Sequence, residues 1–331
     1  MDLDAYVSAH REEWARLDEL SKRRRLGGAE ADELIDLYQR VATQLSVVRS
    51  AAPDPSLVAR LSSLVARARA AATAAHDPAW RDVARFFTVS FPSAVYRTRR
   101  WSGLAALGSL LLALVVAWWV AAHPQVQAAV ASREQVRQLV ENDFAGYYTQ
   151  YASSSFAAQV WTNNAWVAAQ CVAFGVLGLP VLWVLAQNAL NLGLVGGLMA
   201  VGGRLDLFFG LILPHGLLEL TAVFVAAGAG LRLFWAWVEP GPRTRTQALG
   251  EEGRSAIAVA LGLILVLAVS GAVEGFVTPS GLPTWARIAI GVVVEVAFLA
   301  YVATLGRWGA RRGETGDLAA EDAGDVLPTR G

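Results

Sequence analysis

The sequence predicts an all-α protein: a polytopic transmembrane helical bundle of about six spans, with an N-terminal cytoplasmic helical domain. Hydrophobic residues make up 55% of the 331 residues, and the mean hydropathy is +0.40. Charged residues make up 17%, against roughly 25% in an average soluble domain. The charges gather in residues 1–100, whereas 101–308 contains long runs without any. The chain therefore divides into a water-facing part and a lipid-facing part.

Residues 1–100 are predicted to form the soluble domain. Apolar residues recur there every three or four positions, which is typical of amphipathic helices. One such stripe consists of Leu34, Leu37, Tyr38, Val41, Leu45 and Val48. Gly27-Gly28 and the prolines at 53 and 55 mark breaks between helices. About four short helices packed as a bundle is the simplest arrangement.

Residues 101–308 are predicted to form the transmembrane domain, because six stretches approach the roughly 20 residues that cross a bilayer. Their bounds are 104–122, 163–184, 185–201, 207–235, 257–273 and 285–305. Little separates the second stretch from the third, so 185–201 is either a full span or one arm of a re-entrant hairpin. The fourth stretch is long for one simple span and contains Pro214.

The distribution of arginine predicts the orientation, because basic residues favour the cytoplasmic side of a membrane. Arginines cluster before the first span, in the loop 239–254 and after the last span, whereas the segment 123–160 holds only two. We expect a multi-pass membrane protein with both termini cytoplasmic and 123–160 outside. Residues 309–331 are acidic and rich in glycine, which predicts a disordered cytoplasmic tail.

Polar residues inside the spans are the candidate functional residues, since a charge at the bilayer centre costs roughly 2.5–3.5 kcal/mol. His215 and Glu219 are four residues apart, so they share one helix face. They are either a proton-handling or ligand-binding pair, or a hydrogen-bonded pair that pins the helix. Two ligands alone are a weak metal signal, and neither a metal nor a cofactor is predicted.

Topology places several of these residues toward the outer side, which makes a joint site more plausible than any one of them alone. The predicted polar cluster consists of Asn163, Asn164, Asn191, His215, Glu219 and Glu274. Glu295 falls midway through the last span and is expected to face Arg232 or another polar neighbour. Gly193 and Gly197 form a GxxxG spacing, which indicates either close packing within the chain or a dimer seam.

Catalytic motifs are missing from the sequence. It contains no P-loop, HExxH, GxSxG or cysteine-based metal motif, so no catalytic residue is predicted. The net charge is zero, which argues against nucleic acid as a partner. Membrane lipids and proteins of the membrane or envelope are the expected partners, with a second copy of the chain as an alternative.

Four elements together resemble the stage II sporulation protein M family over about residues 90–305. They are Asn163-Asn164, Asn191 with Gly193, the run Pro214-His215-Gly216-x-x-Glu219, and the run 273–279 that contains Glu274. The resemblance implies a protein of a bacterial plasma membrane without known catalytic activity. It further implies a scaffold that recruits envelope or peptidoglycan-remodelling partners. A permease or channel that uses the intramembrane polar cluster is the alternative.

Overall fold

The computed structural model describes residues 3–23, 26–51, 54–74, 79–130 and 153–317. Over these residues the chain is helical and has no strand, which confirms the predicted all-α class. The chain divides into two compact units, Met1–Val83 and Ala84–Gly331. The division falls earlier than residue 100, where the sequence placed it.

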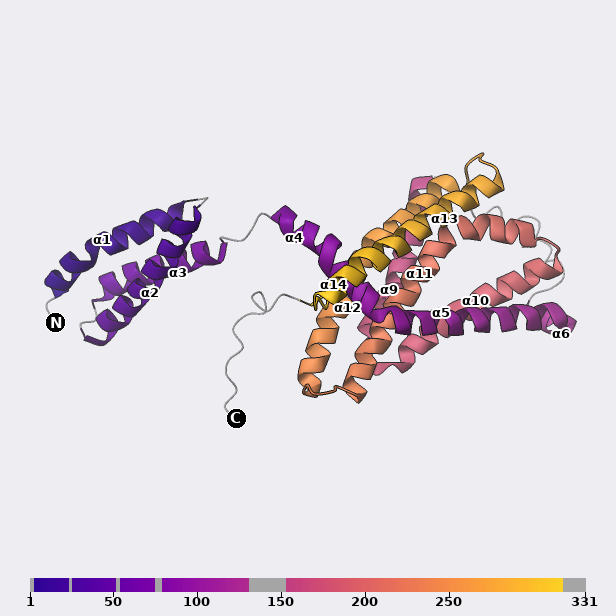
Figure 1. The fold of residues 1–331 in the computed structure, drawn as a ribbon, viewed down its shortest axis with the longest axis horizontal. Coiled ribbons are helices and arrows are strands. Elements are labelled where there is room, and N and C mark those ends of the chain that lie inside the picture. Colours follow the sequence, from indigo (N-terminus) through magenta and orange to yellow (C-terminus); the bar gives the residue numbers. More distant parts are fainter. Residues whose placement is uncertain (1–2, 24–25, 52–53, 75–78, 131–152, 318–331) are drawn as a thin grey trace. The chain divides into compact units, whose positions relative to one another are not determined.

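The first unit is a bundle of three helices, α1 (Leu3–Lys22), α2 (Gly28–Ala51) and α3 (Pro55–Ala74) (Figure 1). Each helix turns one apolar stripe inward, as the spacing of three and four requires. The buried core comprises Trp14, Leu17, Leu20, Leu34, Leu37, Val41, Leu45, Val48, Leu57, Leu61, Leu64 and Ala68. Asp54 begins α3 by accepting hydrogen bonds from the backbone N–H groups of Ser56 and Leu57, at 2.7 and 3.0 Å.

The expected fourth helix of this bundle belongs largely to the second unit. The chain runs helically through α4 (Ala79–Arg85), the π-helical turn η1 (Phe86–Ser90) and α5 (Phe91–Ala122). Phe86, Phe87 and Phe91 pack on the core of the second unit, and Phe91 is 1% exposed. Burial of these rings against the membrane helices explains why the boundary lies before residue 100.

The second unit continues with a series of helices joined by short turns. They are α6 (Pro124–Val130), α9 (Ser153–Ala173), η3 (Gly175–Leu177), α10 (Leu179–Val201), α11 (Leu205–Val238), α12 (Arg245–Ala272), η4 (Val273–Val277), α13 (Thr284–Tyr301), η5 (Val302–Gly306) and α14 (Arg307–Arg311). In the described part of the chain, five helices are long and apolar enough to cross a membrane. These five begin at Asp82, Leu179, Leu205, Arg245 and Thr284.

The boundary between the second and third predicted spans differs from the expectation. α9 ends at Ala173 and α10 starts at Leu179, whereas the sequence placed the division at 184 and 185. Gly178 adopts a φ of 70°, which favours glycine, and Pro180 lies in the first turn of α10. Residues 185–201 are thus the continuation of one 23-residue helix that is long enough for a full span. The count of six spans remains a prediction, in which α9 would be the additional span.

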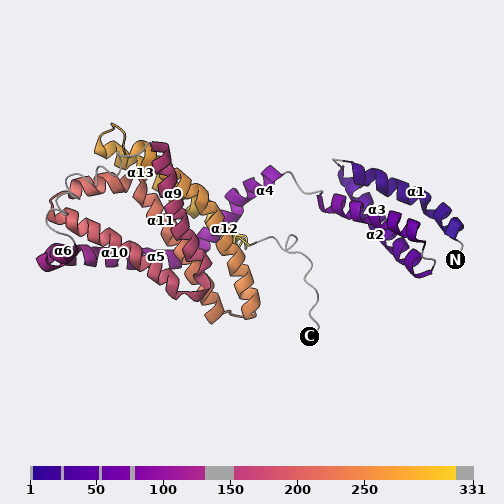
Figure 2. The same ribbon diagram turned by 180° about the vertical axis from the view of Figure 1, so that it is seen from behind.

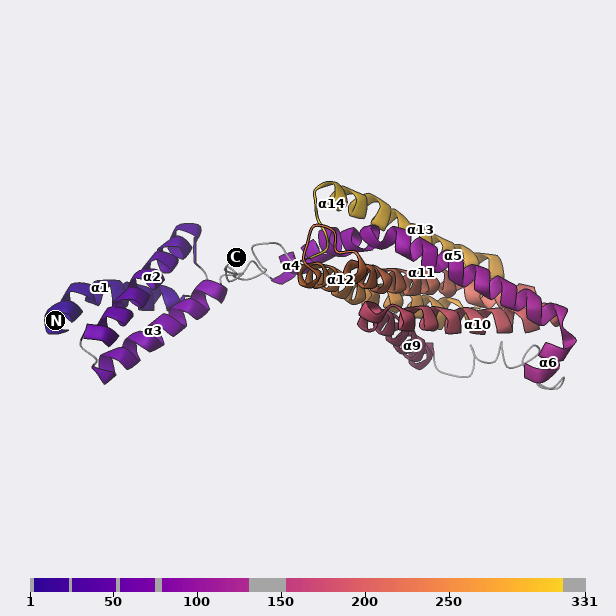
Figure 3. The same ribbon diagram turned by 90° about the horizontal axis from the view of Figure 1, so that it is seen from below.

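Helix α11 occupies the centre of the second unit. It packs against α5, α9, α10, α12 and α13. Figure 2 shows α9 crossing α11, and Figure 3 shows α13 on one side of α11 with α9 and α10 on the other. Every side chain from Ala222 to Gly230 is buried. Small residues allow this close approach: a methyl group on Gly228 would lie 2.6 Å from the backbone nitrogen of Ser102 on α5.

Gly193 and Gly197 form a packing seam within the chain. A methyl group on Gly193 would lie 2.8 Å from Cβ of Val116, and one on Gly197 would lie 2.8 Å from the carbonyl oxygen of Ala117. Both glycines therefore bring the backbone of α10 close to α5. Of the two alternatives for this motif, the structure shows the intrachain one.

The surface of the second unit is strongly apolar along several helices. Exposed side chains include Leu107, Leu111, Leu114 and Trp118 of α5, and Val293 and Val296 of α13. An apolar surface of this extent marks contact with a membrane. Together with the five long apolar helices, it identifies a multi-pass membrane protein.

Candidate functional site

Three ionisable side chains converge inside the second unit. His215 and Glu219 lie one turn apart on α11, and Glu274 lies in η4. One ligand atom from each residue lies within 4.8 Å of those of the other two. His215 is 5% exposed and Glu274 is 2% exposed, whereas Glu219 is partly buried. We call these three residues the His–Glu–Glu cluster.

Both nitrogens of the His215 ring have polar neighbours. Nε2 lies 3.7 Å from Oε1 of Glu274, and Nδ1 lies 3.3 Å from the Thr278 hydroxyl. Ser270 donates a 2.9 Å hydrogen bond to the backbone carbonyl of His215. Two residues of η4 and its C-terminal end, Glu274 and Thr278, thus contact the ring, while Ser270 of α12 binds the backbone of His215.

The two carboxyl groups are only partly satisfied by hydrogen bonds. The side chains of Asn164 and Ser270 are placed to hydrogen-bond the Glu219 carboxyl group. Oε1 of Glu219 and Oε2 of Glu274 are buried and have no hydrogen-bond partner. A buried acceptor without a partner is costly and is uncommon in native proteins.

A π-helical turn positions Glu274. In η4 the backbone N–H of Thr278 donates to the carbonyl of Val273, five residues back, at 3.0 Å. This wider turn carries both Glu274 and Thr278 toward His215. Single π-helical turns within α-helices occur frequently at functional sites.

Some of the predicted polar residues lie outside this cluster. Asn164 reaches Glu219, but its neighbour Asn163 is exposed because the next helical position points about 100° away. Asn191 on α10 is exposed as well. Glu295 accepts a 2.8 Å hydrogen bond from Thr221, so it has the expected polar neighbour, and the alternative of Arg232 is wrong.

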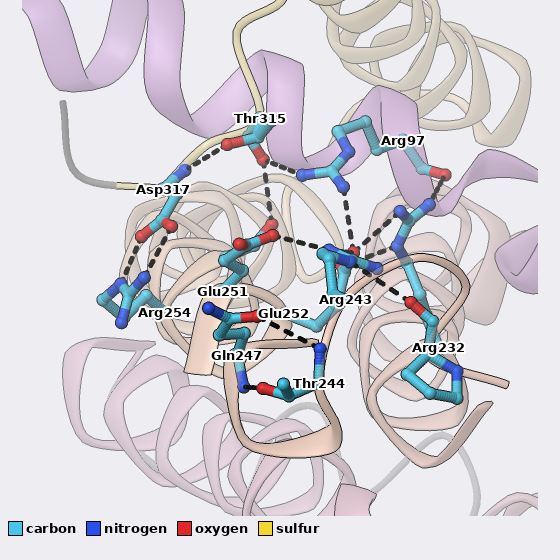
Figure 4. Close-up of polar contacts among 12 residues, drawn as sticks. Arg97, Arg232, Arg243, Thr244, Gln247, Glu251, Glu252, Arg254, Thr315 and Asp317 are labelled. Atoms are coloured by element: carbon cyan, nitrogen blue, oxygen red, sulfur yellow. Dashed lines mark hydrogen bonds and ion pairs between the residues drawn. The ribbon is translucent and has the colours of Figure 1, made fainter. Parts of the chain in front are cut away.

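A second polar network surrounds Glu252 on α12 (Figure 4). Glu252 is 3% exposed. It accepts hydrogen bonds from Arg97 of α5 at 2.9 Å and from Arg232 of α11 at 2.7 and 3.0 Å. Arg243 lies 3.8 Å from Glu252 and pairs with Glu251 at 2.5 Å. One carboxylate thereby joins three elements of the second unit.

The segment after α14 lies on this network. The carbonyl oxygen of Thr315 accepts hydrogen bonds from Arg97 and Ser255, at 2.7 and 3.1 Å. Asp317 forms an ion pair with Arg254 (Figure 4). Residues 309–317, which the sequence assigned to a disordered tail, therefore contact the bundle, and 318–331 lie outside the described residues.

Sequence reasoning missed the Glu252 network. It treated Arg97 and Arg243 as markers of the cytoplasmic side and did not pair them. The available signal was Arg232, a single cation within the apolar run 207–235, together with Glu252 near the start of the next apolar stretch. Which carboxylate meets Arg232 depends on how α11 and α12 pack, and the sequence does not contain that information directly.

The chemistry available to the His–Glu–Glu cluster is limited to protons and cations. An imidazole and two carboxyl groups accept and release protons, and all three side chains are ligands for metal ions. The Glu252 network, in contrast, pairs its carboxylate with cationic groups and acts as a structural tie.

Two families match the chain, one in each unit. A domain of unknown function (DUF8413) matches residues 4–74. Comparisons with curated proteins and with solved structures give no match. The family described as stage II sporulation protein M matches residues 106–279, which contain α10, α11, α12 and the whole His–Glu–Glu cluster. On this match over more than half of its length, the chain belongs to the stage II sporulation protein M family.

Proposed function

We propose that the protein is a non-enzymatic scaffold of a bacterial plasma membrane that recruits envelope or peptidoglycan-remodelling proteins. The observation that carries this proposal is the presence of two units with separate cores. The core of α1–α3 and the core around α11 have no residue in common. Among the described residues the core of the first unit comes from α1–α3 alone, and we infer that this separate bundle has a binding role.

The surface of the first unit supports a self-contained module. Arg16 of α1 makes a bidentate contact with Glu33 of α2, at 2.9 and 2.8 Å. Arg67 of α3 pairs with Asp18 of α1 at 2.8 Å. These ion pairs join α1 to α2 and α1 to α3 at the surface of the bundle. In the membrane unit, Glu252 likewise joins α12 to α5 and α11 through ion pairs, which stabilise that unit.

Recruitment is tested by co-purification in mild detergent after cross-linking in cells. Val41 is fully buried in the first unit, whereas Val47 on the same helix is 38% exposed. Val41→Asp places a charge in the core and should unfold the bundle, while Val47→Asp adds the same charge on the surface. We expect Val41→Asp to lose envelope partners that Val47→Asp retains. Recovery of the same partners with Val41→Asp would refute recruitment by the bundle.

Orientation is part of the proposal and has its own test. We place both termini in the cytoplasm and 123–160 outside, from the arginine distribution. Gln125 and Thr246 are exposed, so single cysteines there can be labelled in a Cys171→Ser background. An impermeant thiol reagent applied to intact cells should label position 125 and leave 246 unlabelled. The reverse pattern would overturn the orientation.

A second candidate function, a permease or channel, is favoured by the buried unpartnered oxygens of Glu219 and Glu274. Proton flux into liposomes that contain the purified protein would support it. Glu219→Gln keeps the polar contacts and should be tolerated better than Glu219→Leu if the residue only pins helices. If Glu219 carries protons, both variants should abolish flux. Absence of flux in the unaltered protein would exclude proton transport.

A further inference from the structure

We propose that His215, Glu219 and Glu274 bind one divalent transition-metal ion of the Zn²⁺ or Mn²⁺ class. The inference is independent of the scaffold role, because it concerns only the interior of the membrane unit. It begins with geometry: three groups that are able to ligate a metal, from two helices, place one ligand atom each within 4.8 Å of the others.

The spacing is close to that of a metal centre. Ligand atoms bound at about 2.0–2.2 Å from one ion are separated by roughly 3–4 Å. Nε2 of His215 and Oε1 of Glu274 already satisfy this range at 3.7 Å. The other ligand atoms, which lie within 4.8 Å of one another, must approach by about 1 Å to reach this range. A change of rotamer in the carboxylate side chains is enough for such a shift. Three protein ligands leave at least one coordination position for water.

The unpartnered oxygens point to a missing ligand. Glu274 is 2% exposed, and its Oε2 has no hydrogen-bond partner. Oε1 of Glu219 is also buried and has no hydrogen-bond partner. An ion held between the two residues, bound by both oxygens of Glu274, would satisfy Oε2 of Glu274 and Oε1 of Glu219 at once. Glu295 also has a buried unpartnered oxygen, but it stands outside the group of converging ligands.

Charge balance favours a divalent cation. Two carboxylates this close, away from water, repel each other strongly. Within the described residues, neither Glu219 nor Glu274 forms an ion pair with an arginine or lysine. A neutral imidazole, two carboxylates and one divalent cation have zero net charge, which suits a low-dielectric membrane interior.

The surroundings orient the ligands as in known metal sites. A metal-bound histidine usually has a hydrogen-bond partner on its second nitrogen. Here the Thr278 hydroxyl lies 3.3 Å from Nδ1 of His215, which leaves Nε2 directed at Glu274. Arg287 donates a 2.6 Å hydrogen bond to the backbone carbonyl of Thr278 and so holds this residue in place. Asn164 is similarly placed beside Glu219.

The donor set selects the class of metal. Ca²⁺ and Mg²⁺ prefer oxygen ligands alone, and soft ions such as Cu(I) prefer sulfur. One imidazole with two carboxylates suits Zn²⁺, Fe²⁺ and Mn²⁺. Co²⁺ replaces these ions and has visible absorption bands, so it is a suitable probe.

The test is a Co²⁺ titration of the full chain in detergent, purified without a histidine tag and treated with chelator. We expect a visible absorption band that saturates at one equivalent and that Zn²⁺ displaces. Glu274→Gln and His215→Gln should each weaken binding roughly tenfold or more, since loss of even an outer partner costs 10–100-fold. Glu295→Gln is the matched control and should bind as the unaltered protein does.

The folding of each variant is checked by its helical circular dichroism and by its melting temperature without metal. As a second measurement, Zn²⁺ should raise the melting temperature of the unaltered protein and of Glu295→Gln, because it binds the folded state. It should leave that of Glu274→Gln unchanged. No cobalt band in the unaltered protein, or a band of equal affinity in Glu274→Gln and His215→Gln, would overturn the proposal.

Discussion

Removing the carboxylate of Glu252 is the sharpest test of how the membrane unit is held together. Glu252→Ala leaves two guanidinium groups without their counter-ion, and their side chains are 19% exposed for Arg97 and 27% for Arg232. Breaking a buried ion pair from one side costs about 3–5 kcal/mol. Both arginines keep one hydrogen bond to a carbonyl and some solvent contact, so we expect the lower end, about 3 kcal/mol.

The adjacent residue offers a matched control. Glu251 pairs with Arg243, but its side chain is 42% exposed. Exposed ion pairs contribute about 0–1 kcal/mol. Glu251→Ala therefore removes the same group, one position away on the same helix, with little expected effect.

The assay is thermal unfolding in mild detergent, followed by tryptophan fluorescence at one scan rate for all variants. A change of 1 kcal/mol shifts the melting temperature by about 2–4 °C in proteins of this size. Glu252→Ala should therefore melt about 6–12 °C lower, and Glu251→Ala within about 2 °C of the unaltered protein. Equal melting temperatures for the two variants would show that Glu252 is not a structural tie.

Three further predictions concern other parts of the chain. Gly197→Ala should destabilise the membrane unit by about 1–3 kcal/mol through overpacking against α5, whereas Gly108→Ala, which meets no atom within 4 Å, should not lower the melting temperature. Hydrogen bonds from Lys22 and Arg67 hold the pKa of Asp18 below its ordinary value. The charged Asp18 therefore stabilises the first unit fully above the unfolded pKa of about 4, and this stabilisation is lost as the pH falls through the folded pKa. Hydrogen exchange in α1–α3, corrected for its intrinsic rate, should accelerate below about pH 4. Unchanged protection at pH 3 would contradict this prediction. Removing bound metal with EDTA should lower the melting temperature of the unaltered protein but not that of the metal-ligand variants, and an equal drop in both would point to an effect of the chelator elsewhere.

Periodicity and composition determined the fold class because both act locally along the chain. The stripe that contains Leu34, Val41 and Val48 is buried as its spacing predicts. The pair His215 and Glu219 shares one face because four residues make about one turn. The same local rule predicts neither the partner helix nor its rotation, which is why Asn163 and Asn191 were included in the cluster although they are exposed.

Tertiary packing decided the rest, because the decisive contacts join residues far apart in sequence. Glu274 approaches His215 only because a π-helical turn ends α12 beside α11. Glu295 lies beside Thr221 of α11. Arg232 lies about 11 residues further along α11, or roughly 16 Å, and there it meets Glu252 near the start of α12. The sequence by itself determined that polar groups had to avoid lipid, since exposing a charge there is costly. Only the packing of α11 against the surrounding helices determined which of those groups meet.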